Sequence, residues 1–432
     1  MLLFILLTVK FLLFQYFTKI ISAPWLVFAM DMVFLSIYYL IARRKDKVST
    51  IISLVIYSVI SFIIFADIVY FTYFNRLPSI YELGHAGVLT DVTDAIFVLI
   101  RWHDYLFILD IPVLIFLAYK NKLHLIDQFI EDKLKKFYQY IPYAMLLISV
   151  LIIAIGHNRI NEVRDMQLFT YHARDILGLR HENYSDLDLQ GNYEKSSNTP
   201  NEWTGIAKGK NLFIIQVESL NNFVINREYN GHEITPVMNK LIEENGTIYA
   251  DDYFELLGAG NTSDAEFVSL HSLYPSIKNP SYEVYKDKYV FGLPKILTEN
   301  GYKNTAFHNY KRDFWIRDTA YPHIGFERFI AEDNYELDDI IAMGLSDKSF
   351  FRQSMPYILD MDRPIFAFLV TLTSHIPYEM PDEDIVIPIK PKDQGSIFGN
   401  YMNSIHYTDA AIGEFIDDLK KHNLYDDSVI VI

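Results

Sequence analysis

Five apolar runs in the first 156 residues constrain the fold of this chain more than any other feature of its sequence. They lie at about residues 2–21, 25–41, 51–74, 105–119 and 141–155. Most approach the roughly 20 apolar residues that a helix needs to cross a bilayer, so the sequence predicts an N-terminal five-helix transmembrane bundle over residues 1–156. A re-entrant or core helix is an alternative for the fourth run, which is short and contains Asp110. A cleaved signal peptide is an alternative for the first run, but no basic segment precedes it.

The distribution of Lys and Arg between these runs predicts their orientation. Four basic residues lie in the segment 43–47 and five in the segment 120–136, whereas the loop at 75–104 has only Arg76 and Arg101. Loops rich in Lys and Arg stay in the cytoplasm. We therefore expect five crossings with the N-terminus inside, a multi-pass protein of the cell membrane, and an extracellular domain after Gly156.

Three carboxylates interrupt the apolar runs, at Asp31, Asp67 and Asp110. A charge within the hydrocarbon region is costly, and by default it suggests a functional role. The alternative, which we favour, is that these side chains face the interior of the bundle or lie near an interface.

Charge is divided unevenly along the 432 residues, whose net charge is −16. Residues 1–156 carry 13 Lys and Arg against 11 Asp and Glu, and the remaining residues carry 25 against 43. The acidic residues after 156 leave no basic surface that could neutralise many backbone phosphates, which argues against a nucleic-acid partner. The chain has no Cys, so it has neither disulfides nor thiolate chemistry.

After the apolar runs, residues 157–205 are polar and rich in turn residues, which predicts a linker. From residue 211 short apolar runs alternate with helical segments, which predicts a mostly parallel sheet flanked by helices in an extracellular domain over residues 206–432. Strands are expected at 211–217, 302–307, 364–372 and 428–432. Helices are expected at 236–244, 262–272, 291–300, 348–360 and 400–422.

The segment 258–267, GAGNTSDAEF, is a Gly-flexible turn that leads to Thr262 and Ser263 at a predicted helix start. Ser263 and Glu266 have the S-x-x-E spacing of a capping box. Thr262 would then lie beside free backbone N–H groups at the positive end of the helix dipole, where a phosphate is stabilised, and its hydroxyl can act as a nucleophile. The alternative is that Thr262 or Ser263 is only an N-cap.

Polar residues follow three of the predicted strands, namely Glu218, His308 and His375. In open α/β sheets ligands gather beyond the carboxyl ends of the strands. A carboxylate, a hydroxyl and imidazoles at one edge of the sheet indicate a divalent-metal site. Such a site can activate an alcohol for nucleophilic attack on a phosphoryl group. Taken singly, Glu218 could cap the following helix, and each His could be a hydrogen-bonded loop residue.

The segment 309–318, NYKRDFWIRD, interleaves aromatic and cationic side chains. This mixture suits an anionic ligand that also bears hydroxyls, because Arg binds phosphate and Trp provides a flat aromatic surface. The alternative is that Phe314 and Trp315 are core residues and that Lys311, Arg312 and Arg317 are solvated.

Six ordered motifs make the chain resemble the lipoteichoic acid synthases, polyglycerol phosphate transferases of the alkaline phosphatase/sulfatase superfamily. The resemblance spans residues 211–432, and the five-helix anchor also matches. The motifs are FIIQVESLNNFVIN at 213–226, ITPVMNKL at 234–241, GNTSDAEF at 260–267 with HSLYP after it, FWIRD at 314–318, TLTSHIPY at 371–378 and SIHYTDAAIGEFI at 404–416.

The resemblance implies an extracellular, sulfatase-like catalytic domain that depends on Mn²⁺, or on Mg²⁺ or another divalent cation. Phosphatidylglycerol in the lipid bilayer would be the donor, and a glycolipid or polyglycerol phosphate the acceptor. Thr262 would be the catalytic nucleophile that releases diacylglycerol, and Glu218 and Thr262 would be metal ligands. The residues implied to hold the glycerophosphate headgroup are Trp315, Arg317, His375 and, beside them, His308.

The chain departs from the family pattern at two places. Asn261 stands where the family often has Lys immediately before the nucleophile, so one positive charge is missing. The chain also ends at SVIVI, where the family continues into an Asp-His pair that completes the metal site. We therefore expect a C-terminally truncated sequence that binds metal poorly and is inactive. The alternatives are a phosphatase- or sulfatase-type hydrolase, a phosphoethanolamine transferase, and a non-catalytic membrane-tethered binding module.

Overall fold

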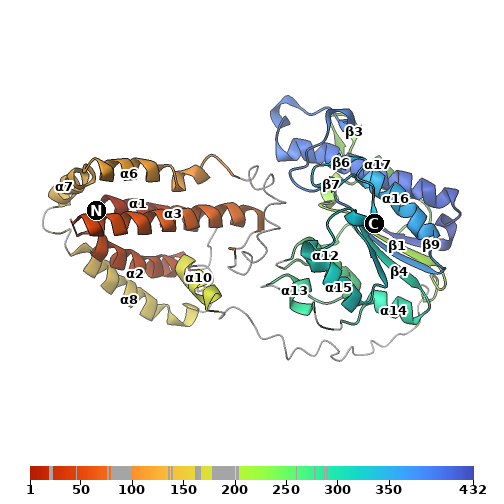
Figure 1. The fold of residues 1–432 in the computed structure, drawn as a ribbon, viewed down its shortest axis with the longest axis horizontal. Helices are drawn as coiled ribbons and strands as arrows, with labels where there is room; N and C mark the ends of the chain where they lie inside the picture. Colours follow the sequence, from red (N-terminus) through yellow and green to blue (C-terminus); the bar gives the residue numbers. More distant parts are fainter. Residues whose placement is uncertain are drawn as a thin grey trace. The chain divides into compact units, whose positions relative to one another are not determined.

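The computed structural model describes residues 1–18, 23–44, 46–74, 77–78, 100–134, 137, 140–160, 167–177, 200, 204–258, 260–276, 279–286, 288 and 290–432. The chain divides into two compact units, Met1–Glu182 and Asn183–Ile432. Figure 1 shows helices in the first unit and a sheet with helices on both of its faces in the second.

The first unit places a helix at each of the five apolar runs. These helices are α1 (Leu2–Phe17), α2 (Pro24–Ala42), α3 (Lys47–Phe74), α6 (Asp110–Tyr119) and α8 (Ile141–Ile155). The described part also contains α7 (Leu123–Leu134), α10 (Leu168–Ile176) and the 3₁₀ turns η2 (Asp104–Phe107) and η4 (His157–Arg159).

By length and composition, two helices among the described residues are able to cross a membrane, Pro24–Ala42 and Lys47–Thr72. Leu2–Phe17 and Ile141–Ile155 are shorter apolar helices, and α6 has only ten residues. Five crossings therefore stay a prediction. Most of the loop expected to face outward, residues 79–99, lies outside the described residues.

The carboxylates within the apolar runs lie among the helices, as the favoured alternative predicted. Asp31 and Asp67 are only 1% and 2% exposed. Asp110 is less buried, and it accepts a hydrogen bond from the buried Lys10 ammonium at 2.8 Å. The buried charges in this unit are thus compensated by polar partners, as an apolar environment requires.

Helix α10 begins within the segment predicted as a linker. Gln167 precedes it and donates to Asp31 at 2.7 Å, and His172 in its second turn contacts Asp67 at 2.8 Å. Leu168 is buried in the core of the first unit. The linker predicted for residues 157–205 is therefore wrong over α10, which packs as part of the first unit, whereas residues 178–199 lie outside the described part.

The second unit is built on a five-stranded sheet in the order β5-β4-β8-β1-β9, in which every pair of neighbours is parallel. This confirms the predicted mostly parallel sheet. The strands are β1 (Asn211–Gln216), β4 (Lys303–His308), β5 (Arg328–Ile330), β8 (Ile365–Val370) and β9 (Ser428–Val431). Two small antiparallel pairs are β2 (Glu228–Tyr229) with β3 (His232–Glu233) and β6 (Ile340–Ile341) with β7 (Gly344–Leu345).

Helices cover both faces of this sheet (Figure 1). The central strand β8, IFAFLV, is buried along its whole length, as expected of a parallel strand covered on both sides. Ala367 and Leu369 belong to one core with residues of α16 and α17, while Phe366 and Phe368 belong to a second core with residues of α12 and α15. The helices are α11 (Pro236–Glu243), α12 (Thr262–His271), α13 (Ser281–Tyr285), α14 (Leu293–Glu299), α15 (Arg317–Ile324), α16 (Asp347–Leu359) and α17 (Ile397–Lys421).

Candidate functional site

The register of the sheet brings the carboxyl ends of three strands level. Gln216 of β1 and His308 of β4 both pair with Val370 of β8. Glu218 lies just beyond β1, and the segment that contains His375 follows β8. The structure therefore places the polar residues at or just beyond the carboxyl ends of β1, β4 and β8 at one edge of the sheet, as predicted.

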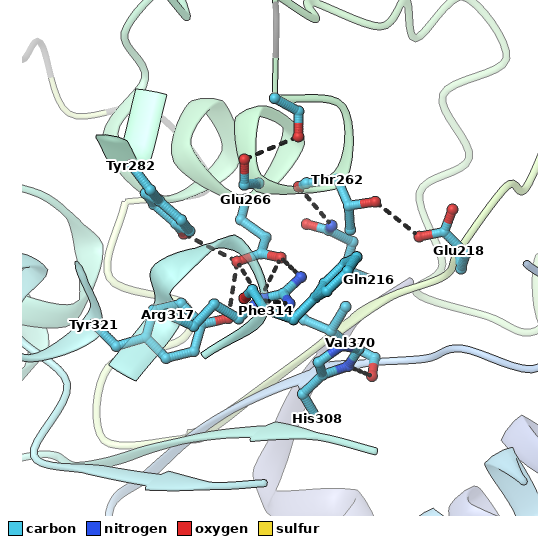
Figure 2. Close-up of polar contacts among 12 residues, drawn as sticks. Gln216, Glu218, Thr262, Glu266, Tyr282, His308, Phe314, Arg317, Tyr321 and Val370 are labelled. Atoms are coloured by element: carbon cyan, nitrogen blue, oxygen red, sulfur yellow. Dashed lines mark hydrogen bonds and ion pairs between the residues drawn. The ribbon is translucent and has the colours of Figure 1, made fainter. Parts of the chain in front are cut away.

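Thr262 lies next to Glu218, although the two residues are 44 positions apart in the chain. The Thr262 hydroxyl donates to Glu218 Oε2 at 3.1 Å, a contact shown in Figure 2. Thr262 is half-buried and forms the first residue of α12. A hydroxyl and a carboxylate thus face each other at the edge of the sheet, which is the central feature of the predicted site.

The backbone of Glu218 is held by the loop that follows β8. Its N–H donates to the Thr371 hydroxyl at 2.9 Å, and its carbonyl accepts from the Ser374 hydroxyl at 2.6 Å. Asp347, fully buried at the start of α16, accepts from the backbone N–H groups of Leu372 and Thr373 and so fixes this loop. The Glu218 carboxylate therefore projects from a backbone fixed on two sides.

The turn before Thr262 is organised by Asp264 rather than by a capping box. Asp264 Oδ2 accepts from the backbone N–H of Gly258 at 3.0 Å and of Gly260 at 2.7 Å. The predicted capping box is wrong, because Ser263 donates to the Gly260 carbonyl at 2.9 Å and the Glu266 carboxylate points into the interior, where it forms an ion pair. Spacing alone could not distinguish a capping Glu from an inward-facing one.

Strained backbone gathers around the candidate residues. Ser219, Asn261, Trp315, Ile316 and Tyr378 all have a φ between 41° and 63°, in the left-handed region that L-residues rarely adopt. Each is a candidate residue or lies within three positions of one. Such strain costs about 1–3 kcal/mol per residue and persists where the surroundings over-determine the backbone, which is typical of functional sites.

Arg317 is buried rather than solvated, with 1% of its surface exposed. Its Nη2 lies 2.6 Å from Glu266 Oε1, and its Nε donates to the same carboxylate. Trp315, two residues earlier, is half-buried. Among the residues that the structure describes, neither side chain hydrogen bonds to Thr262 or Glu218.

His308 is a buried, neutral imidazole. Burial, and then the neighbouring Arg317, lowers the pKa of His308 well below its ordinary value. Its Nδ1 lies 3.0 Å from the Val370 carbonyl, which only accepts, so Nδ1 carries the proton and Nε2 is left as an acceptor. His375 is half-buried, and its Nδ1 lies 2.7 Å from the Ile376 carbonyl.

The donor set fits part of a divalent-cation site. Glu218 and Thr262 offer two oxygens of the kind that hard cations bind. Gln216, whose side chain reaches the Thr262 carbonyl at 3.4 Å, has a buried Oε1 with no hydrogen-bond partner among the described residues. Within the described part of the chain, no group of three or more His, Asp or Glu side chains converges as a metal site.

Three residues that organise this edge were missed by sequence reasoning, namely Gln216, Asp264 and Asp347, and a fourth, Glu266, was assigned to a capping box instead. The signal for Glu266 was present, because a residue four positions after Thr262 lies on the same face of a helix. Gln216 and Asp347 carried no local signal, since their roles depend on strand register and on a loop 25 residues away.

Comparisons with known proteins match both parts of the chain. The family model described as Sulfatase matches residues 210–432, and the model of the lipoteichoic acid synthase N-terminal domain matches residues 1–176. The lipoteichoic acid synthase of Staphylococcus saprophyticus is 31% identical over 399 residues, covering 87% of this chain and 61% of that protein. Lipoteichoic acid synthase 2 of Bacillus subtilis is 31% identical over 414 residues, covering 90% and 62%.

A crystal structure of the lipoteichoic acid synthase LtaP of Listeria monocytogenes aligns with a TM-score of 0.51 and 32% identity. The alignment covers 56% of this chain and 59% of that one. The chain thus spans about three fifths of the length of these relatives. The resemblance to lipoteichoic acid synthases and the sulfatase-like fold predicted from the motifs are confirmed.

Proposed function

This chain belongs to the sulfatase family. We propose that it is a membrane-anchored phosphoglycerol transferase. It would move glycerophosphate from phosphatidylglycerol to a polyglycerol phosphate or glycolipid acceptor. The observation that carries the proposal is the contact of 3.1 Å between the Thr262 hydroxyl and the Glu218 carboxylate. Similarity to lipoteichoic acid synthases along both units supports it.

Thr262 is the proposed nucleophile. In the first step the Thr262 hydroxyl gives up its proton as its Oγ1 bonds to the lipid phosphorus, the bond from phosphorus to the diacylglycerol oxygen breaks, and that oxygen takes up the proton. In the second step an acceptor hydroxyl attacks the phosphorus, the bond from phosphorus to Thr262 Oγ1 breaks, and the proton lost by the acceptor restores the Thr262 hydroxyl. Because Thr262 donates its hydrogen bond to Glu218, the oxygen is oriented while both of its lone pairs stay free for attack.

Glu218 and Thr262 are the residues that would hold a divalent cation, Mn²⁺ or else Mg²⁺ or another such ion. When bound, the ion supplies Lewis-acid chemistry that makes a hydroxyl oxygen more nucleophilic and offsets phosphoryl charge. Trp315, Arg317, His375 and His308 are assigned to the headgroup. Since His308 Nε2 is an acceptor, it suits a glycerol hydroxyl rather than a phosphate oxygen.

The membrane part is proposed to cross the bilayer five times, with the outer domain outside the cell. Two helices of sufficient length and two shorter apolar helices support this topology. The Lys- and Arg-rich segments at 43–47 and 120–136 support its orientation. The lipid donor and the tethered catalytic domain would then meet at the outer surface of the membrane.

Product analysis tests the proposal. Full-length protein in liposomes is incubated with Mn²⁺ and phosphatidylglycerol that carries a labelled headgroup. Transfer predicts a ladder of labelled polyglycerol phosphate together with diacylglycerol. Free labelled glycerol phosphate without a ladder would instead identify a hydrolase, and labelled lipid that binds without turnover would identify a binding module.

A further inference from the structure

Glu266 lies at the centre of a buried polar network on the same helix as Thr262, one turn further along (Figure 2). Its carboxylate accepts from Arg317 through Nε and Nη2, from the Tyr282 hydroxyl at 3.0 Å and from the Tyr321 hydroxyl at 2.8 Å. Glu266 and Tyr321 are fully buried, and Tyr282 and Arg317 are each 1% exposed. Four donors therefore surround one carboxylate from which solvent is excluded.

This network joins two of the elements that position candidate residues. Thr262 and Glu266 are four positions apart on α12, whereas Arg317 is the first residue of α15. Immediately before Arg317, Trp315 and Ile316 have φ values of 57° and 51°, which for a β-branched residue such as Ile is a genuine outlier. Contacts from outside the turn are needed to hold Trp315 and Ile316 in this strained conformation.

The Arg317 guanidinium reaches both the strained turn and the helix. Its Nη1 donates to the Phe314 carbonyl at 3.2 Å, while its Nε and Nη2 are fixed by Glu266. The planar fork of Arg matches a carboxylate in two-point geometry, so the pair sets orientation as well as distance. The turn that carries Trp315 is thereby fixed relative to the helix that carries Thr262.

We propose that Glu266 is a positioning residue for the proposed transfer reaction, holding Trp315 and Arg317 in place relative to the Thr262 hydroxyl. The inference rests on the proposed function, and it assigns to Glu266 no contact with the substrate. It also changes the role of Arg317, whose charge is offset by a carboxylate. Arg317 orients its neighbours through the hydrogen bonds that it donates to Glu266 and to the Phe314 carbonyl.

Removal of the Tyr282 or Tyr321 hydroxyl is the smallest substitution that disturbs this network. Burial, and then the neighbouring Glu266, raises the pKa of both phenols well above the ordinary value, so both remain hydroxyl donors. Tyr282→Phe and Tyr321→Phe each take one donor from Glu266 Oε2 without leaving a buried charge unpaired. Glu266→Gln is the stronger test, but it leaves the Arg317 cation buried without a counterion.

The matched control is Tyr335→Phe. Tyr335 is also buried, and its hydroxyl also makes a hydrogen bond, of 2.9 Å, to Ser354. Tyr335 belongs to the core on the other face of the sheet, with residues of α16 and α17. The same chemical change is thus made away from α12 and α15.

The first measurement is hydrogen exchange of full-length protein, which needs no turnover. Tyr321→Phe and Tyr282→Phe should speed exchange in the segment 313–318, which contains the Ile316 and Asp318 amides bonded to Asp313 and Arg312, and leave α17 unchanged. Tyr335→Phe should not affect 313–318. Unchanged exchange in 313–318 in both Tyr variants, or an equal effect of the control, would overturn the inference.

The second measurement is labelled-headgroup transfer. Loss of positioning should lower kcat about tenfold or more while KM for the lipid changes little, because misplacement of reacting groups acts on the chemical step. A purely structural role would lower the active fraction and leave the kcat of the folded enzyme unchanged. A wild-type protein that makes no polymer would contradict the proposed function, whereas the exchange result would still decide the role of Glu266.

Discussion

At the scale of single residues, the proposed chemistry depends on one hydroxyl. Thr262 makes a single side-chain hydrogen bond among the described residues, to Glu218. Its side chain is half-buried at the start of a helix. Removal of the hydroxyl therefore largely separates chemistry from folding, because the loss of one such hydrogen bond costs only about 1 kcal/mol.

We expect Thr262→Ala to abolish release of diacylglycerol, by a factor of at least about 10³ if Thr262 is the attacking group. The thermal midpoint should stay close to that of the wild type. The measurement is labelled-diacylglycerol release by purified full-length protein in liposomes. Thr247→Ala, a matched change at an exposed turn residue, should retain activity. Undiminished release by the Thr262 variant would show that another group attacks the lipid.

At the scale of elements, α12 carries a second consequence, which is pH-dependent stability. His271 in its last turn is 3% exposed, and its ring stacks on Phe267 with centroids 4.7 Å apart. Its Nδ1 lies 2.8 Å from the Phe267 carbonyl, while its Nε2 is buried without a hydrogen-bond partner among the described residues. Burial lowers the pKa of His271 from 6.5 to about 4.

Between pH 6.5 and about pH 4, His271 takes up a proton in the unfolded state but stays neutral in the folded state. A fall in pH over this range therefore favours the unfolded state. The contribution of His271 to stability is complete above pH 6.5 and is lost as the pH falls toward 4. Between pH 7 and pH 4.5 the loss amounts to about 2 kcal/mol. His271→Phe keeps an aromatic ring but has no group that titrates. Between pH 7 and pH 4.5 the unfolding free energy of this variant should therefore fall by about 2 kcal/mol less than that of the wild type.

Denaturant unfolding of full-length protein in detergent at both pH values, followed by hydrogen exchange in α12, measures the difference. The wild type and His271→Phe should differ in how stability changes with pH, rather than only in stability at pH 7. Parallel pH dependence in the two proteins would mean that His271 is not held neutral in the folded state.

The elements that the sequence predicted well are those whose own periodicity decides their structure. The four predicted strands and five predicted helices of the second unit are all present, with ends shifted by at most three residues. Buried parallel strands read as continuous apolar runs, and α17 has a regular apolar face, so local patterns sufficed.

Elements whose structure depends on distant partners were missed. Strand β5 has three residues and lies at the edge of the sheet. Helix α15 begins directly after the strained Trp315 and Ile316 and contains Pro322, and α10 lies in a polar segment. Each is stabilised by tertiary contacts that propensity does not encode. The predicted capping box was wrong for the same reason, because Glu266 instead forms an ion pair with the buried Arg317, which lies 51 residues further along the chain.

At the scale of the whole molecule, the sequence separates an apolar first unit from an acidic second one, and the division at Glu182 and Asn183 follows this change. The membrane topology decides whether the two parts can act together on a lipid. Two crossings and five crossings agree on the location of the segment 43–47 and of the outer domain. They disagree on the location of the loop after α6, and that loop therefore distinguishes them.

The absence of Cys allows a direct test with single-Cys variants. Arg44→Cys, Asn121→Cys and Glu243→Cys each place a thiol at an exposed position. With five crossings, a membrane-impermeant maleimide should label Glu243→Cys in intact cells and the other two only after permeabilisation. With crossings at α2 and α3 alone, Asn121 would lie on the same side as Glu243. Labelling of Asn121→Cys in intact cells would therefore exclude the five-crossing topology, while the Arg44 variant verifies that the cells remained sealed.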